Sequence, residues 1–188
     1  MDNRILGIQG WMGEVELDWL SQMTKKQRPD ALIVELGAWR GRSTAGIVVS
    51  MSPSMTVITV DTWLGQYDLR TTAHSDVMKT DLFLEFMDNM KIFGITPKWY
   101  SRQHGGLYYL RMDSALAPLL FDNDSVDMLF IDCDHRRFGE DIDSWKEKVK
   151  PHGIISGHDY YWEGAKEAID KRVLVEELIG DIWWGYKD

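Results

Sequence analysis

Short β-rich runs alternate with longer helical patterns along this chain, and this alternation constrains the fold more than any other feature. Five runs predict strands, at residues 31–37, 55–61, 107–113, 125–132 and 153–159. Between them, apolar spacing predicts amphipathic helices in residues 76–93 and 138–149, and Pro151 is expected to end the second. Ser43 is expected to cap a further helix. Alternation of this kind predicts parallel strands joined by right-handed crossovers.

The C-terminal part departs from this rhythm. A helical pattern at residues 163–172 leads into two strand-like runs that Gly180 and Asp181 separate, as the turn of a hairpin would. Residues 64–75 and 96–106 are expected to be long loops. We therefore predict an α/β, Rossmann-like, doubly wound fold, with a mostly parallel seven-stranded sheet and a C-terminal antiparallel hairpin strand.

Composition limits the architecture and the class of partner. A length of 188 residues with 44% hydrophobic residues predicts a single domain over 1–188, with an N-terminal helix region at 1–29. The net charge of -9 disfavours nucleic acids and anionic membranes, so a small-molecule partner is expected. One cysteine and no long apolar run lead us to expect a cytoplasmic protein. The oligomeric state stays open, a homo-oligomer included.

Polar clusters follow each predicted strand. They read "ELGAWRGRST", "DTW", "DS", "DCDH" and "HDYY" in chain order. Ligands of open α/β sheets bind beyond the carboxyl ends of the strands, where the strand order reverses. We therefore expect these clusters to meet in one crevice, with Asp132 and His135 on its rim.

The first cluster is typical of a nucleotide-binding loop. Gly37 allows a tight turn and a close approach of a ligand, and Gly41 precedes a helix whose N-terminus attracts anions. Asp61 lies 24 residues after Gly37, near the spacing at which an acid binds ribose hydroxyls. The Gly-x-x-x-Gly spacing differs from that of dinucleotide sites, which favours a nucleoside without a pyrophosphate. Alternatively, the two glycines only make a tight strand-to-helix turn.

Six motifs together carry a family resemblance. They are "GWMGEVELDWL", "VELGAWRGRST", "VDTW", "RMDS", "LFIDCDH" and "VKPHGIISGHDY", and they span most of the chain in this order. With them the chain resembles the class I S-adenosylmethionine-dependent methyltransferases, in particular the O-methyltransferase-like branch called methyltransferase family 24. The resemblance implies an enzyme with S-adenosylmethionine as its cofactor.

The resemblance also implies which residues bind that cofactor. Glu35, Gly37 and Gly41 would line its methionine end, Asp61 would bind the ribose, and Trp63 would flank the adenine. The full implied set is Glu35, Gly37, Ala38, Gly41, Ser43, Thr44, Asp61, Thr62, Trp63, Asp113, Ser114 and Asp132. A sulfonium is a cation, so an acidic crevice suits it.

A divalent cation is a further implication of the resemblance, with Asp132, His158 and Asp159 as its ligands. Oxygen ligands favour Mg²⁺ or Ca²⁺, whereas the histidine shifts the preference toward Mn²⁺. The alternative is that His158 and Asp159 form a structural hydrogen-bonded pair without a metal.

His135 stands three residues after Asp132, where the resemblance implies a base that deprotonates the acceptor. Such a step is worth about 10² to 10⁴ in rate. The alternative is a surface histidine beside Arg136 and Arg137. Asp132 is expected to be catalytic with His135, by positioning the acceptor oxygen or by holding a metal that lowers the pKa of this oxygen. We therefore expect an O-methyltransferase acting on a hydroxyl of a small acceptor, a sugar or a catechol-like ring. An NAD(P)-dependent oxidoreductase and a non-catalytic cofactor-binding protein are the alternatives.

Overall fold

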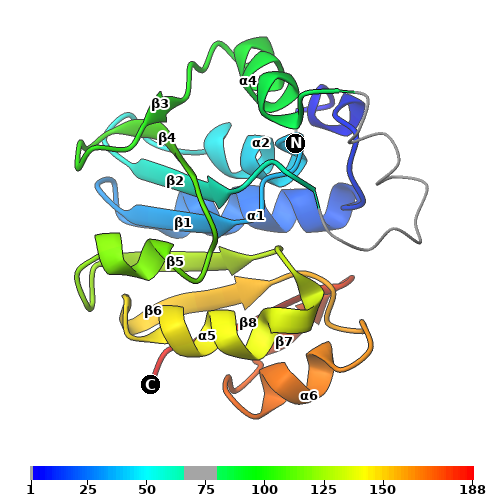
Figure 1. Ribbon diagram of the computed structural model, residues 1–188, viewed down its shortest axis with the longest axis vertical. Coiled ribbons are helices and arrows are strands. Elements are labelled where there is room, and N and C mark those ends of the chain that lie inside the picture. The colour runs from blue at the N-terminus through cyan, green and yellow to red at the C-terminus, as the bar shows by residue number, and fades with distance from the viewer. Residues whose placement is uncertain (1, 66–79) are drawn as a thin grey trace.

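A computed structural model describes residues 2–65 and 80–188, and its secondary structure forms one sheet with helices on both faces (Figure 1). The strands are β1 (Leu32–Leu36), β2 (Thr56–Asp61), β3 (Lys98–Trp99), β4 (Gly106–Arg111), β5 (Val126–Ile131), β6 (Val149–Gly157), β7 (Glu177–Ile179) and β8 (Ile182–Tyr186). The α-helices are α1 (Glu14–Lys26), α2 (Arg42–Val48), α4 (Leu82–Ile92), α5 (Phe138–Lys146) and α6 (Ala165–Asp170). Short 3₁₀ helices are η1 (Ile5–Gly7), η2 (Ala117–Leu120) and η3 (His135–Arg137).

The sheet has the order β3-β4-β2-β1-β5-β6-β8-β7, and it is parallel except for β8, which is antiparallel to both of its neighbours. The predicted Rossmann-like fold with an antiparallel C-terminal hairpin is confirmed. Eight strands are present among the described residues, one more than the seven predicted. The strand β3 falls inside the expected loop 96–106, because two exposed edge residues give no readable pattern.

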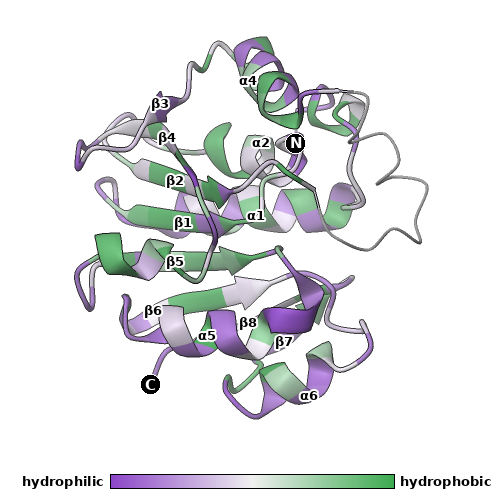
Figure 2. Cartoon of the chain, in the orientation of Figure 1, coloured by the Kyte–Doolittle hydropathy of each residue, from purple (hydrophilic) through white to green (hydrophobic). Residues whose placement is uncertain are grey.

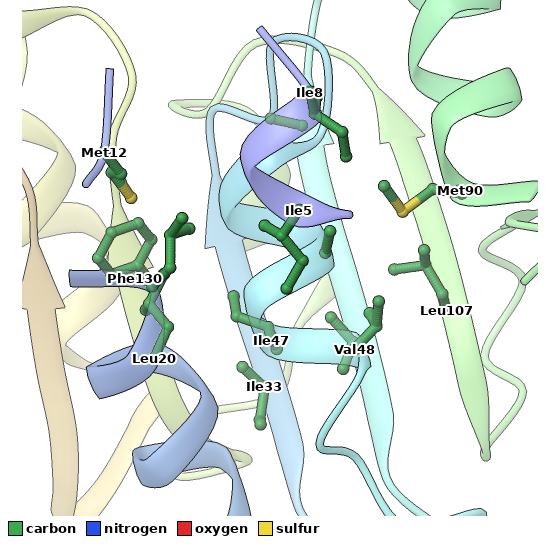
Figure 3. Close-up of a cluster of buried hydrophobic side chains, with 14 of the residues drawn as sticks. Ile5, Ile8, Met12, Leu20, Ile33, Ile47, Val48, Met90, Leu107 and Phe130 are labelled. Atoms are coloured by element: carbon green, nitrogen blue, oxygen red, sulfur yellow. The ribbon is translucent and has the colours of Figure 1, made fainter. Parts of the chain in front are cut away.

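Two apolar clusters cover the two faces of the sheet. On one face α1, α2, η1 and α4 pack on the strands, and Figure 3 shows Ile33 of β1, Ile47 of α2 and Leu20 of α1 in this cluster. On the other face α5 and α6 pack, with Trp145 and Ile169 fully buried. Successive side chains of a strand point to opposite faces, so a strand covered on both sides is apolar throughout. Figure 2 shows this hydrophobic colouring in β1, β2 and β5.

Two helices on the first face start where a particular residue favours it. Asp81 accepts hydrogen bonds from the backbone N–H groups of Phe83 and Leu84, so α4 begins at Leu82 and ends near the predicted boundary. The earlier part of the predicted helix 76–93, up to residue 79, lies outside the described residues. Gly41, with φ +90°, precedes α2. Ser43 was expected to cap this helix, and that expectation is wrong because its hydroxyl donates to Glu35 instead.

The segment between α5 and β6 differs from the prediction. The helix α5 ends at Lys146, and Val149, expected on its face, begins β6. Pro151 therefore lies within β6 and does not end the helix. The pairing of β5 with β6 shifts between Val126 and Met128, so Pro151 lies in an irregular part of the ladder, where its missing N–H removes no paired bond.

The C-terminal hairpin forms as predicted, with Gly180 at φ +61° in the turn between β7 and β8. None of the helices in the described ranges combines the length and the apolar character that a membrane crossing requires.

Candidate cofactor and catalytic site

Backbone hydrogen bonds join the loops at the carboxyl ends of four neighbouring strands. Gly37 N–H donates to the Val60 carbonyl (2.8 Å), Asp132 N–H to the Leu36 carbonyl (2.7 Å) and His158 N–H to the Ile131 carbonyl (3.0 Å). The loops after β1, β2, β5 and β6 therefore lie side by side. They meet between β1 and β5, where the strand order reverses, as the polar clusters predicted.

Both loop glycines are required by the fold itself. Gly37 has φ +86°, and a Cβ there would lie 2.0 Å from the carbonyl oxygen of Asp132. Gly41 has φ +90°, and a Cβ would lie 2.7 Å from Cε of Met90. The alternative reading, a tight strand-to-helix turn, thus accounts for both residues without a ligand. The same packing brings the loop after β1 against the loop after β5.

Asp61 holds the glycine loop in place. Its Oδ2 accepts hydrogen bonds from the N–H groups of Ala38 (2.7 Å) and Trp39 (2.9 Å), and its Oδ1 accepts one from Trp63 N–H (2.7 Å). Burial raises the pKa of this carboxyl even though these donors favour its ionised form. Because Oδ1 accepts only one of these bonds, it keeps capacity for another donor. Thr62 follows directly and caps the next turn by accepting from Leu64 N–H.

Glu35, Ser43 and Thr44 form a buried network beneath this loop. The Ser43 and Thr44 hydroxyls each donate to a different oxygen of the Glu35 carboxyl, both at 2.6 Å. Glu35 is fully buried, and this burial raises its pKa to about 7 against the two hydrogen bonds. The three predicted cofactor residues thus join the end of β1 to the start of α2.

Trp63 lies in the apolar core. Its side chain is 3% exposed, its ring packs 5.0 Å from the rings of Phe83 and Phe86, and its indole N–H donates to the Trp39 carbonyl. This position makes Trp63 a support of the glycine loop, and its predicted contact with adenine stays a prediction.

The turn after β4 contacts the turn after β5. Asp113 forms an ion pair with Arg137 (3.2 Å), and the Ser114 hydroxyl donates to the buried Asp141 (2.7 Å). Cys133 contacts the second oxygen of Asp141, so it too belongs to this network. Asp113 and Ser114 are therefore fixed at the same edge of the sheet as the glycine loop.

The predicted catalytic and metal-ligating side chains lie together after β5 and β6. His135 Nε2 is 2.6 Å from Asp159 Oδ2, and His158 Nδ1 is 3.2 Å from Asp159 Oδ1 and 3.9 Å from Asp132 Oδ1. Asp134 caps η3 by accepting from Arg136 and does not join this group. The pair of His158 and Asp159 that the metal-free alternative requires is therefore present.

Comparison with known proteins identifies the family. No curated protein sequence matches this chain. Residues 34–160 match methyltransferase family 24, described as a methyltransferase domain. The chain belongs to this family. The resemblance to class I S-adenosylmethionine-dependent methyltransferases is thereby confirmed, and the NAD(P)-dependent oxidoreductase is no longer the competing enzyme class.

Solved structures show the same fold. A protein from Corynebacterium glutamicum is 12% identical, with a TM-score of 0.68 over 100% of this chain and 90% of its own. An O-methyltransferase from Bacillus cereus, in complex with S-adenosylhomocysteine, is 14% identical, with a TM-score of 0.61 over 100% and 92%. A methyltransferase from Podospora anserina, also bound to S-adenosylhomocysteine, is 12% identical, with a TM-score of 0.61 over 95% and 80%.

The ionisable groups of this candidate site shift one another's pKa values. Burial opposes the charged form of His158, but hydrogen bonds to Asp159 and Glu16 outweigh it and raise its pKa to about 11. Burial raises the pKa of Asp132 to about 7, against the attraction of His158. Hydrogen bonds to both histidines outweigh burial in lowering the pKa of Asp159, and the bond to Asp159 raises the pKa of His135. Asp159 is thus the fixed negative charge of the site.

The donor set fits a divalent cation. One ligand atom from each of Asp132, His158 and Asp159 lies within 4.8 Å of the others. Two carboxylates and one imidazole suit Mg²⁺ or Mn²⁺. The raised pKa of His158 favours a proton on its ring between the two carboxylates, and a bound cation would replace that proton.

Two residues outside the predicted site set contact its histidines. Trp162 stacks on His135, with ring centroids 4.6 Å apart, and its side chain is 46% exposed. Glu16, on α1, contacts His158 across 142 positions of sequence. Only the folded chain brings such residues together. The two described cavities, about 450 Å³ beside α6 and about 340 Å³ beside β4, lie away from this site.

Proposed function

We propose that this methyltransferase transfers a methyl group from S-adenosylmethionine to a hydroxyl of a small acceptor. The observation that carries the proposal is the pair of His135 and Asp159, 2.6 Å apart, at the same edge of the sheet as the loop of Gly37. This edge offers a nucleoside-type loop and a base in one place. The bound Bacillus cereus and Podospora anserina structures support the choice of cofactor, because each holds S-adenosylhomocysteine in the same fold.

The cofactor half of the proposal uses the loop after β1 and the end of β2. Gly37, Ala38 and Gly41 form the surface of the loop, and Asp61 binds the ribose hydroxyls through its spare acceptor capacity at Oδ1. Asp113 and Ser114 border the adenine. S-adenosylmethionine supplies an electrophilic methyl group on a sulfonium, and the carboxylates of the crevice favour that cation.

His135 takes the proton of the acceptor hydroxyl. Its Nε2–H donates to Asp159, which leaves Nδ1 as the nitrogen that receives a proton. The charge of Asp159 stabilises the imidazolium that forms, and stacking on Trp162 fixes the plane of the ring. A general base of this kind contributes about 10² to 10⁴ in rate, and alignment of the oxygen adds about 7 to 11 kcal/mol in favourable cases.

Asp132, His158 and Asp159 would hold a divalent cation, Mg²⁺ or Mn²⁺. Such a cation lowers the pKa of a hydroxyl that it touches. The acceptor itself is a small hydroxyl compound, a sugar or a catechol-like ring. The exposed part of Trp162 beside His135 supports a ring-shaped acceptor, because an aromatic face packs well on a ring.

The test is transfer of a radiolabelled methyl group from S-adenosylmethionine to a panel of monosaccharides and catechols. We expect turnover with at least one compound, and we expect His135→Ala to lower kcat about 10² to 10⁴-fold because the proton acceptor is lost. Calorimetry should show unchanged affinity for S-adenosylhomocysteine. His104→Ala, an exposed histidine at the opposite end of β4, is the matched control and should keep wild-type turnover.

Two outcomes would contradict the proposal. Wild-type turnover in His135→Ala would remove the assigned base. Binding of S-adenosylhomocysteine without transfer to any hydroxyl would favour the non-catalytic cofactor-binding protein. A thermal-shift comparison of S-adenosylhomocysteine with NAD⁺ tests the choice of cofactor, because only the first compound should stabilise the protein.

A further inference from the structure

Glu16 is a buried carboxylate whose partners come from three distant segments. Its Oε2 accepts a hydrogen bond from Gly13 N–H (2.7 Å), at the start of its own helix. Its Oε1 accepts one from Asp181 N–H (2.8 Å), in the turn between β7 and β8, and faces Nε2 of His158 at 3.2 Å. One side chain thus joins α1, the C-terminal hairpin and the loop after β6.

The Glu16 carboxylate is buried against its partners. Glu16 is 9% exposed and His158 is 5% exposed. A Cβ at Gly180, where φ is +61°, would lie 2.6 Å from Oε1 of Glu16. The turn therefore packs its backbone directly on the carboxylate. These three contacts fix the Glu16 carboxylate against His158.

This contact decides which nitrogen of His158 faces the cation site. A carboxylate only accepts hydrogen bonds, so the contact with Glu16 places a hydrogen on Nε2 of His158. The other nitrogen, Nδ1, points toward Asp159 at 3.2 Å and Asp132 at 3.9 Å. Carboxylates that bind the far nitrogen of a metal-ligating histidine fix its tautomer and ring orientation.

We propose that Glu16 is a positioning residue that holds His158 with Nδ1 directed at Asp132 and Asp159, so that cation affinity depends on α1. This inference rests on the cation site of the proposed function. It adds a residue outside the set of Asp132, His158 and Asp159, and it assigns α1 a role in the chemistry of the site as well as in packing.

The test is calorimetric titration of Mn²⁺ into the intact protein in the presence of S-adenosylhomocysteine. Glu16→Leu removes the acceptor and should weaken Mn²⁺ affinity about 10- to 100-fold, the usual cost of losing such a partner. Glu16→Gln keeps one oxygen acceptor and should recover part of the loss. Leu17→Ala is the matched control, because Leu17 is fully buried on the same helix and belongs to the apolar cluster. Its Mn²⁺ affinity should equal that of the wild type.

Each outcome has a defined meaning. If Glu16→Leu and Glu16→Gln bind Mn²⁺ as the wild type does, the inference is overturned. It is equally overturned if Leu17→Ala loses the same affinity, since docking of α1 alone would then explain the effect. Wild-type protein that binds S-adenosylhomocysteine but no Mn²⁺ also overturns the inference and leaves methyl transfer standing. Failure to bind S-adenosylhomocysteine would instead refute the proposed function. Should Glu16→Leu not fold, the Mn²⁺ affinities of Glu16→Gln and Leu17→Ala are compared instead. A weaker affinity in Glu16→Gln alone supports the inference, and equal affinities overturn it.

Discussion

Burial raises the pKa of Glu35, and this shift makes the free energy of unfolding depend on pH. Its pKa rises from 4.5 to about 7 in the folded protein, because burial outweighs the hydrogen bonds from Ser43 and Thr44. A raised pKa contributes stability that is fully present below about 4.5 and is lost as the pH rises through about 7. At about 1.4 kcal/mol for each pKa unit, the whole effect amounts to a few kcal/mol.

We therefore predict that Glu35→Gln removes this dependence. The free energy of unfolding of the wild type, minus that of Glu35→Gln, should fall as the pH rises from about 4.5 to above 7. Other groups, such as Asp132, titrate in both proteins, so most of their contribution cancels in the difference. Urea denaturation at several pH values measures it. If the free energies of unfolding of the two proteins change with pH in parallel, the pKa of Glu35 is not raised as described.

Single site residues could be predicted from the sequence where they lie close to the end of a predicted strand. Asp61 ends β2, and Asp132, His135 and Asp159 follow the ends of β5 and β6, so the pattern of strands locates all four at one edge. Glu16 gave no such signal, because its partners depend on how α1 docks. Ser43 was assigned to a cap because serine is common there, and a buried carboxylate, which no local pattern reveals, competes for its hydroxyl.

At the scale of elements, the close approach of the loops after β1 and β5 depends on Gly37. Gly37→Ala should cost more than about 2 kcal/mol of unfolding free energy, since positive φ is strained and the new Cβ meets the Asp132 carbonyl. Gly94→Ala is the matched control: φ is +72° there, but nothing lies within 4 Å of the added Cβ. It should cost only about 1 to 2 kcal/mol. Equal costs in urea denaturation would mean that the two loops do not pack as closely as described.

Long, strongly patterned elements were predicted well and irregular ones were not. The buried strands β1, β2 and β5 have apolar runs that sequence alone reveals. Val149 fits both the apolar face of α5 and the start of β6, and the sheet pairing of β6 with β5 decides between them. The two residues of β3 are exposed and become a strand only because β4 lies beside them.

For the whole molecule, topology creates the site. No single loop holds both the glycine turn and His135, but the reversal of strand order between β1 and β5 sets the loops of Gly37 and Asp132 together. Two other elements complete the arrangement. Glu16 of α1 contacts His158, and Asp181 in the turn of the C-terminal hairpin donates to the Glu16 carboxylate. The family and the edge of the sheet where the polar clusters meet could therefore be predicted from the sequence. The contacts that orient the imidazoles of His135 and His158 could not, because they depend on how the chain folds.

A crystal structure of the protein with S-adenosylhomocysteine tests this account most directly. We predict that the adenosyl group lies between the loop of Gly37 and the carboxylate of Asp61, with the sulfur directed toward His135 and Asp132. Binding of the ligand away from the edge where β1 meets β5, or with its sulfur turned from His135, would contradict the account.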